Sequence, residues 1–169
     1  TGIEIKDSDS VVGSAGTVNF GDGLTVSPVS AGVVTVTASG GSLQSRTIVS
    51  ASTTSIADDA VGFTTAAGFK AYTLMKVGVS TAAWIRIYTD STSRANDSSR
   101  SVGEDPSPGS GVIAEVVTTG ISTQQMITPF AMGGNMDDPV SNVIYLAIKN
   151  LSGSTQTITA NLTILQLEA

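Results

Sequence analysis

The stretch AYTLMKVGVSTAAWIRIYT, residues 71–89, is the part of the sequence densest in strand-forming residues, and it decides the fold class. Both of its halves alternate with period two, as β-strands with two different faces do. One face of the second half carries Trp84, Arg86 and Tyr88, and the other face is apolar. Small, turn-permissive residues at 78–82 separate the halves, so we predict a β-hairpin or a meander.

Similar strand patterns recur at regular spacing on the C-terminal side of residue 45. We predict strands at 46–52, 61–66, 112–118, 124–128, 143–150 and 157–167. Pro129 is expected to end the strand at 124–128. The strands at 143–150 and 157–167 flank a turn at 151–154 and should form a hairpin. No helical period is sustained, so the sequence predicts an all-β fold, an antiparallel β-sandwich that is jelly-roll-like.

The first 41 residues differ from the rest in having only very short apolar alternations between glycines. Apolar residues flank a single polar residue at Ile3 and Ile5, Val18 and Phe20, Leu24 and Val26, and Val34 and Val36. Such short strands offer few side chains to a core, and an isolated small hairpin is marginal in water. With a linker at 39–42, we predict an N-terminal β-segment at 1–41 for docking or strand exchange and a β-sandwich domain at 42–169. The segment is expected to pack on the main domain, on a symmetry mate or on a larger partner.

Composition removes several classes of site. The 169 residues contain no cysteine and no histidine, which excludes disulfides, thiolate catalysis, the Ser-His-Asp triad and metal centres built on these residues. A net charge of -6 with only 13% charged residues lacks the basic footprint of a nucleic-acid-binding protein. There is no long apolar run, no secretory signal and no Gly-rich phosphate loop after a strand, so no membrane and no cofactor are expected. A start at Thr1 fits removal of an initiator methionine, so we expect a nearly complete gene product.

Residues 90–111 carry almost no apolar side chain. The segment is either a linker or a long surface loop with a helical turn near 91–99. Its arginines, Arg94 and Arg100, lie among acidic residues. They can either form local salt bridges that order the loop or contact a partner, and the sequence does not decide between these two roles. A second loop, 130–139, is rich in Gly, Met and Asp. The expected exposed-loop contacts are Arg94, Arg100, Asp137 and Asp138.

Acidic residues are candidate ligands for calcium. Asp7 and Asp9 have the first spacing of an EF-hand loop, but Val12 stands where the turn glycine is needed, which excludes that motif. Two looser clusters remain: Asn135 with Asp137 and Asp138, and Asp97 with Glu104 and Asp105. Carboxylates in polar loops are mostly solvated turn formers, so no metal is predicted.

Two further kinds of site, a glycosidase carboxylate pair and an aromatic platform, compete with structural roles for the same residues. Glycoside hydrolysis would need a carboxylate pair drawn from Asp90, Glu115, Asp137 and Asp138. Glu115 lies in the strand 112–118 where Arg86 can face it, which favours a cross-strand ion pair over catalysis. An aromatic platform for sugar stacking would use Tyr72, Trp84, Tyr88 and Tyr145. With aromatics at 5% of the chain, core positions are favoured, and a buried Trp84 would exclude the platform.

Two short runs carry a resemblance to a known family. The runs GTVNF at 16–20 and GVVTVTA at 32–38 resemble the "GTINF" and "GVATVTA" strands of a short β-segment found in virion proteins of marine and cyanobacterial tailed phages. The second part of the chain resembles a domain of the same structural proteins in its runs at 72–76, 83–88, 105–116 and 150–154. The resemblance covers most of the chain, and its motifs are structural. It implies a non-enzymatic bacteriophage virion structural protein that assembles by rotational symmetry as a homotrimer.

The short chain lacks shaft repeats and coiled-coil heptads, which favours one location. We expect a capsid decoration (cement) protein or a short head fibre on the virion surface, made in the host cytoplasm and bound to the major capsid protein or another virion protein. The alternative is a tail-fibre or carbohydrate-binding module that recognises host surface glycans. The expected assembly or partner contacts are Ile3, Ile5, Val18, Phe20, Val34, Val36, Arg86 and Glu115.

Overall fold

The chain divides into two units, which are described separately. In the computed structural model of the protein, the described residues are 3–7, 9–38, 44–120 and 124–169. The first unit is Thr1–Leu43 and the second is Gln44–Ala169. The boundary expected from the sequence lies between residues 41 and 42.

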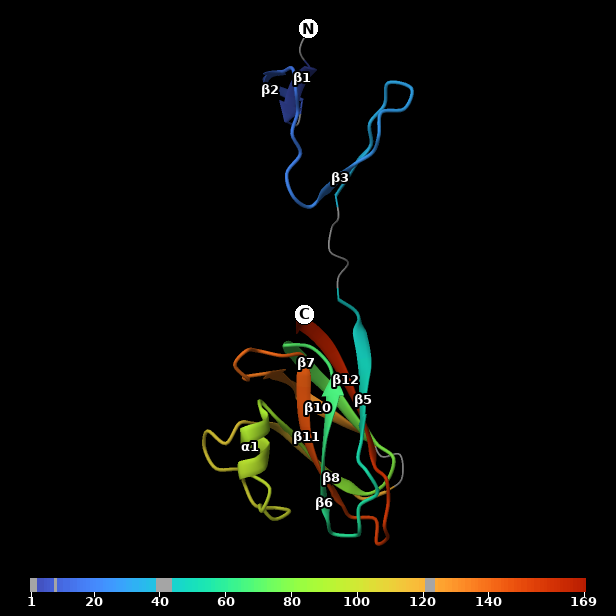
Figure 1. Ribbon diagram of the computed structural model, residues 1–169, viewed down its shortest axis with the longest axis vertical. Coiled ribbons are helices and arrows are strands. Elements are labelled where there is room, and N and C mark those ends of the chain that lie inside the picture. Colours follow the sequence, from blue (N-terminus) through green and yellow to red (C-terminus); the bar gives the residue numbers. More distant parts are fainter. Residues whose placement is uncertain (1–2, 8, 39–43, 121–123) are drawn as a thin grey trace. The chain divides into compact units, whose positions relative to one another are not determined.

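The second unit is a sandwich of two four-stranded antiparallel sheets (Figure 1). Its strands are β5 (Arg46–Ser52), β6 (Val61–Ala67), β7 (Ala71–Val79), β8 (Ala83–Tyr88), β9 (Val112–Thr118), β10 (Gln124–Gly134), β11 (Val143–Asn150) and β12 (Thr159–Glu168). One sheet has the order β10-β7-β12-β5 and the other the order β6-β11-β8-β9. Lettered B to I along the chain, the strands form the sheets B-I-D-G and C-H-E-F, which is the strand order of a jelly roll. The predicted all-β, jelly-roll-like sandwich is confirmed.

The predicted hairpins are wrong. Strands β7 and β8 lie in different sheets, and so do β11 and β12; β8 and β9 are consecutive strands that do pair. The period-two pattern states which face of a strand is buried. It does not state whether the next strand lies beside it or across the core, because both arrangements bury the same residues.

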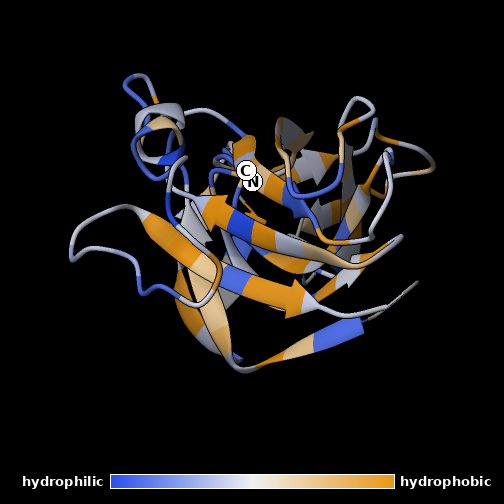
Figure 2. Ribbon diagram, turned by 90° about the horizontal axis from the view of Figure 1, so that it is seen from below, coloured by the Kyte–Doolittle hydropathy of each residue, from blue (hydrophilic) through white to orange (hydrophobic). Residues whose placement is uncertain are grey.

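The core lies between the two sheets, where alternate side chains of each strand point inward. Figure 2 shows the resulting mixture of hydrophobic and hydrophilic segments along the strands. The inward side chains that are almost completely buried include Leu74, Val77, Ile85, Ile87, Ile144, Leu146, Ile148, Ile158, Leu162 and Ile164. Burial of each such side chain contributes about 1.5–3 kcal/mol, so this unit carries its own stabilising core.

Strand β10 continues past Pro129 to Gly134, so the prediction that Pro129 ends the strand is wrong. The pairing of β10 with β7 is interrupted between Met126 and Ala131, and β10 lies at the edge of its sheet. Proline lacks an amide hydrogen, but an interrupted stretch of an edge strand needs no donor at that position.

The polar segment 90–111 is a structured loop that begins with a short helix, α1 (Ser91–Asn96). Asp90 caps this helix by accepting a hydrogen bond from the amide of Ser93 at 2.7 Å. Helix α1 packs against β8 and β11, beside the sandwich in Figure 1. Of the two possibilities left open by the sequence, the surface loop with a helical turn is the one observed.

The hydroxyl of Tyr72 is buried without a hydrogen-bond partner in the described part of the chain. Burial raises the pKa of Tyr72 well above its ordinary value. We expect Tyr72→Phe to leave the free energy of unfolding unchanged or to raise it by up to about 1 kcal/mol, because no hydrogen bond is lost. Tyr88→Phe is the matched control: it removes a 2.7 Å hydrogen bond to Asp97 and should cost about 1.5–3 kcal/mol. Equal losses for the two variants in urea denaturation would contradict this account.

The first unit consists of two short antiparallel pairs. Strand β1 (Ile3–Asp7) pairs with β2 (Ser10–Ala15), and β3 (Leu24–Val26) pairs with β4 (Val36–Ala38). The strand expected at Val18–Phe20 is not observed, and β2 was not predicted. The polar and small residues of β2 (SVVGSA) interrupt the apolar alternation by which a strand is predicted.

Candidate functional site

Apolar side chains of the first unit gather around one open hollow. Its volume is about 690 Å³, and its lining residues are Ile3, Val18, Asn19, Phe20, Val26, Val34 and Val36. Strands β1, β3 and β4 each contribute lining residues, and so do the segments that directly precede β3 and β4. Residues separated by more than thirty positions therefore form one surface, which we call the N-terminal hollow.

The side chains of the N-terminal hollow are exposed. Ile3 is 60% exposed, Phe20 42% and Val36 38%. Among the residues of this unit whose side chains are described, none is buried. The unit thus has apolar side chains but no core of its own, and a two-stranded pair without such packing is marginal in water. An apolar surface of this kind is typical of a site that another chain covers.

Most of the predicted N-terminal contacts lie together in this hollow. Ile3, Val18, Phe20, Val34 and Val36 all line it. Ile5 belongs to β1, but its side chain lies outside the described residues. Val26 also lines the hollow and is not among the expected contacts, although it alternates with Leu24 in the sequence.

Arg86 is completely buried, so its expected role in contacting a partner is wrong. It lies on the face of β8 that loop 90–111 covers. Its Nη1 donates to the backbone oxygen of Asp97 at 2.6 Å and to Oδ2 of the same residue at 3.2 Å. Its guanidinium also lies 4.1 Å from the centroid of the Trp84 ring. The sequence position of Arg86 in a strand predicts an accessible side chain, but loop 90–111 of the same chain covers it.

The expected Arg86–Glu115 ion pair is replaced by other pairs. Arg86 and Glu115 are opposite each other in the β8–β9 register, as predicted. However, Glu115 Oε2 pairs with Arg100 Nη2 at 2.7 Å, and Arg86 pairs with Asp97. Arg100 also donates through Nε to Asp97 Oδ1 at 2.8 Å, so it bridges the two carboxylates. Two arginines and two acids form one compact cluster that holds loop 90–111 on the sheet.

Asp97 is the centre of this cluster. Its carboxylate accepts hydrogen bonds from Arg86, Arg100 and Tyr88. Burial alone would raise the pKa of Asp97, but the hydrogen bonds from Arg100 and Tyr88 and the two positive charges outweigh it and lower that pKa. Burial, followed by the hydrogen bond to Asp97, raises the pKa of Tyr88. The group therefore stays ionised and serves as a structural acceptor.

Two of the four expected exposed-loop contacts, Arg94 and Arg100, bind within the chain. The side chain of Arg100 is only 6% exposed. Arg94 donates to the carbonyl of Thr64 at 2.9 Å and lies over the rings of Phe63 and Tyr145. The prediction that Arg94 and Arg100 are exposed contact residues is therefore wrong, because both guanidinium groups have partners inside the unit.

Asp137 is partly buried, and Asp138 is exposed as expected. The carboxylate of Asp137 accepts hydrogen bonds from Asn135 at 2.9 Å and from Tyr145 at 2.8 Å. Hydrogen bonding, chiefly from Asn135, lowers the pKa of Asp137. The residue thus fixes loop 135–143 through hydrogen bonds to its Oδ2.

The core positions favoured over an aromatic platform are confirmed for Tyr72, Trp84 and Tyr88, and the burial of Trp84 excludes the platform. Tyr72, Trp84 and Tyr88 are each 1% exposed, and Tyr145 is tied to Asp137. Within the described ranges, no group of three or more His, Cys, Asp or Glu side chains is placed to hold a metal ion. None of the helices in the described part of the chain is long and apolar enough to cross a membrane.

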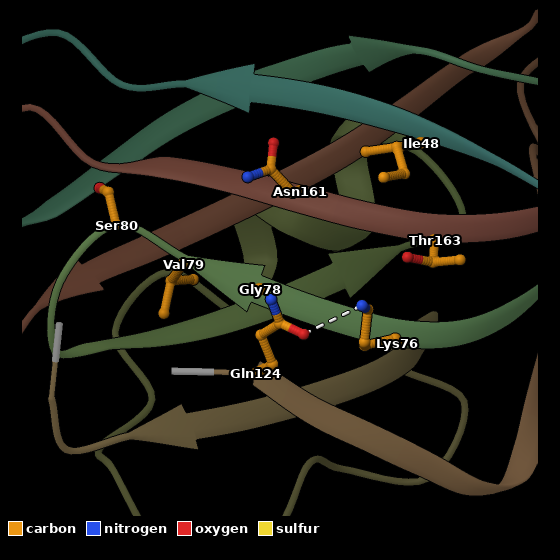
Figure 3. Close-up of a pocket in the computed structure, with 8 residues that line it drawn as sticks. All are labelled: Ile48, Lys76, Gly78, Val79, Ser80, Gln124, Asn161 and Thr163. Carbon is orange, nitrogen blue, oxygen red and sulfur yellow. Dashed lines mark hydrogen bonds between the residues drawn. The ribbon is translucent and has the colours of Figure 1, made fainter. Parts of the chain in front are cut away.

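A second hollow, of about 430 Å³, lies on the sheet β10-β7-β12-β5 (Figure 3). Its lining residues are Ile48, Lys76, Gly78, Val79, Ser80, Gln124, Asn161 and Thr163. Lys76 Nζ donates to Gln124 Oε1 at 3.0 Å, so the one cation among the described lining residues already has a hydrogen-bond partner. Its described lining residues include no aromatic side chain and no carboxylate, so they offer neither stacking nor acid–base chemistry.

The N-terminal hollow is therefore the best candidate for a functional surface. Comparison of the sequence and the fold with protein-family models, with curated proteins and with solved structures finds no match.

Proposed function

We propose that this chain is a non-enzymatic structural protein of a bacteriophage virion. In this proposal it is a capsid decoration (cement) protein or a short head fibre that assembles as a symmetric oligomer on the particle surface. The observation that carries the proposal is the N-terminal hollow, an exposed apolar surface on a unit without a core. The resemblance of residues 16–20 and 32–38 to virion β-segments supports the same reading.

The proposed occupants of the N-terminal hollow are the N-terminal units of neighbouring copies. The described residues that line it carry no charge, so chains that each carry a net charge of -6 can meet at these residues without bringing like charges together. Rotational symmetry gives every copy the same partner surface, and a closed ring of three leaves no hollow uncovered. The homotrimer implied by the resemblance fits this arrangement.

The sandwich has a different role in this proposal. Loop 90–111 covers the outer face of β8, so Arg86 and Glu115 are not proposed as assembly contacts. The proposal places the sandwich on the outside of the particle and the N-terminal unit toward the major capsid protein. The glycan-binding alternative depended on exposed aromatic residues, and it is not proposed because Tyr72, Trp84 and Tyr88 are buried.

The double variant Phe20→Ser/Val36→Ser should disrupt this assembly. Both side chains line the N-terminal hollow, and buried interface anchors each contribute about 2 kcal/mol or more, so we expect association to weaken by about 1,000-fold. Sedimentation equilibrium at micromolar concentration should show the mass of the assembly falling by a factor of about three.

Val29→Ser is the matched control, because Val29 is 72% exposed in the same unit but does not line the hollow. It should leave the mass unchanged. An unchanged mass in the double variant would overturn the assembly role of the hollow. Mass spectrometry of particles purified from the encoding phage tests the location, and absence of the chain from those particles would overturn the virion proposal.

A further inference from the structure

We infer that the free edge of β5 pairs in antiparallel fashion with β5 of a second copy of this chain. Such pairing would join two β10-β7-β12-β5 sheets into one continuous sheet. The inference rests on the proposal that the protein self-associates, but it uses a different surface from the N-terminal hollow. It assigns the sandwich an interface of its own.

Within the described ranges, strand β5 has outward-facing backbone groups at Ile48 and Ser50, whereas the carbonyl of Ser52 already accepts a hydrogen bond from the Thr64 hydroxyl at 2.8 Å. The strand pairs with β12 on one side only, and its register runs from Arg46 to Ser52 without interruption. The amide of Thr53 donates to the carbonyl of Ile158 at 3.0 Å, so odd-numbered residues of β5 face β12. Because antiparallel bonding alternates along a strand, the N–H and C=O groups of Ile48 and Ser50 face away from the sheet.

The other three sheet edges carry features that impede strand addition. On β10, the pairing is interrupted around Pro129. On β6, the carbonyl of Thr64 is occupied by Arg94. On β9, the register shifts beside Tyr88, and the charged Glu115 lies within the strand. Proline, charge and bulges are the usual protections of natural sheet edges, and β5 has none of them between residues 47 and 52.

Charge favours a second copy as the partner of this edge. Residues 47–52 carry no charge, so two chains of the same negative sign can approach there. The only charged residue of β5 is Arg46, at one end. A parallel pairing would place the two Arg46 side chains together, whereas an antiparallel pairing separates them along the strands.

Ile48 supplies the self-complementary contact. It is 63% exposed, and it projects from the same face as Asn161 and Thr163 beside the hollow of Figure 3. Antiparallel pairing with Ile48 opposite Ile48 of the second copy brings the two side chains about 5 Å apart and covers both. Ser50 then lies opposite Arg46 of the second copy. Because hydrogen-bonded pairs alternate along an antiparallel ladder, three such pairs form along the shared edge: 46 with 50, 48 with 48, and 50 with 46.

Cysteine cross-linking tests this arrangement directly, because the chain contains no natural cysteine. Ile48→Cys is treated with a short bismaleimide, and the products are separated on a denaturing gel. Thr163→Cys is the control, since Thr163 lies opposite Ile48 on the neighbouring strand of the same sheet. Three strand spacings, about 14 Å, would separate the two control cysteines. We expect at least about ten times more covalent dimer from Ile48→Cys, because its cysteines are about 5 Å apart.

Ser50→Pro provides the second arm. Its amide faces the free edge, so proline removes a donor needed by the partner and leaves the backbone hydrogen bonds between β5 and β12 intact. The substitution also removes the hydrogen bond from the Ser50 hydroxyl to Asn161 at 2.6 Å. In sedimentation equilibrium we expect the mass of the assembly to fall by half. The double variant Phe20→Ser/Val36→Ser should instead lower that mass by a factor of about three, so failure of either interface is recognised separately.

Equal cross-linking of the two cysteine variants, or an unchanged mass in Ser50→Pro, would overturn the inference. Loss of mass in Ser50→Pro without cross-linking of Ile48→Cys would also overturn it, because another strand would then occupy the edge. Thermal denaturation of Ser50→Pro confirms that the sandwich is folded during these measurements.

Discussion

Replacing Asp97 by alanine is expected to lower the free energy of unfolding by about 3–5 kcal/mol. The carboxylate pairs with Arg86, whose side chain is completely buried, and with Arg100, which is 6% exposed. Removal of the acid leaves the charge of Arg86 in the protein interior without its counter-ion. Urea denaturation measures the loss. Asp105→Asn in the same loop is the control; Asp105 is exposed and should change stability by no more than about 0.5 kcal/mol.

The dependence of stability on pH provides a second readout of the same cluster. The pKa of Asp97 in the folded protein lies below its ordinary value of 3.8. Its contribution to stability is therefore complete above about pH 4 and is lost as the pH falls toward the lowered pKa. Asp97→Asn should show a shallower loss of stability than the wild-type protein in this acid range. Parallel acid profiles for the two proteins would show that Asp97 contributes nothing through its charge.

Replacing Trp84 by alanine is expected to cost about 3–5 kcal/mol of unfolding free energy. The indole is 1% exposed. The guanidinium carbons of Arg86 and Arg100 lie 4.1 and 4.9 Å from its ring centroid, so the substitution removes a large apolar group and two cation–π contacts together. Loop 90–111 should loosen as a consequence, and trypsin should cleave after Arg100 faster than in the wild-type protein.

Val117→Ala separates this effect from a general weakening of β8 and β9. Val117 lies opposite Trp84 in the register of the two strands, but it is 44% exposed. We expect a change in unfolding free energy within about 0.5 kcal/mol and an unchanged rate of trypsin cleavage. A similar loss in both variants would mean that the strand pair, and not the indole, holds the loop.

The sequence contained enough information for the fold class and for most of the strands. Alternation in residues 46–52, 143–150 and 157–167 reports burial of one or both faces, and burial is what period two encodes. The same rule located Ile3, Val18 and Phe20, which line one hollow. The period-two rule locates these residues because strands this short cannot form a core of their own. Their apolar side chains therefore indicate a surface that another part of the assembly must cover.

The positions of the charged side chains were beyond sequence reasoning. Loop 90–111 has almost no apolar residue, so nothing in its pattern indicates that it packs on β8. The loop is anchored by Asp97 and Arg100, whose partners depend on distances of 2.7–3.2 Å that only the fold determines. Strand neighbours were equally hidden, since a strand across the core and a strand beside it show the same alternation.

The place of β12 has a consequence for the order in which the sandwich can form. This last strand lies between β5 and β7, and its Asn161 accepts a hydrogen bond from Ser50, 111 residues earlier. During synthesis, β5 therefore emerges long before the strand that completes its sheet, and closure of that long loop is entropically costly. Folding dominated by such distant pairings is slow, in the range of milliseconds to seconds for comparable β domains. Until β12 has been made, both edges of β5 are free, and nascent chains on one messenger would be exposed to one another through this strand.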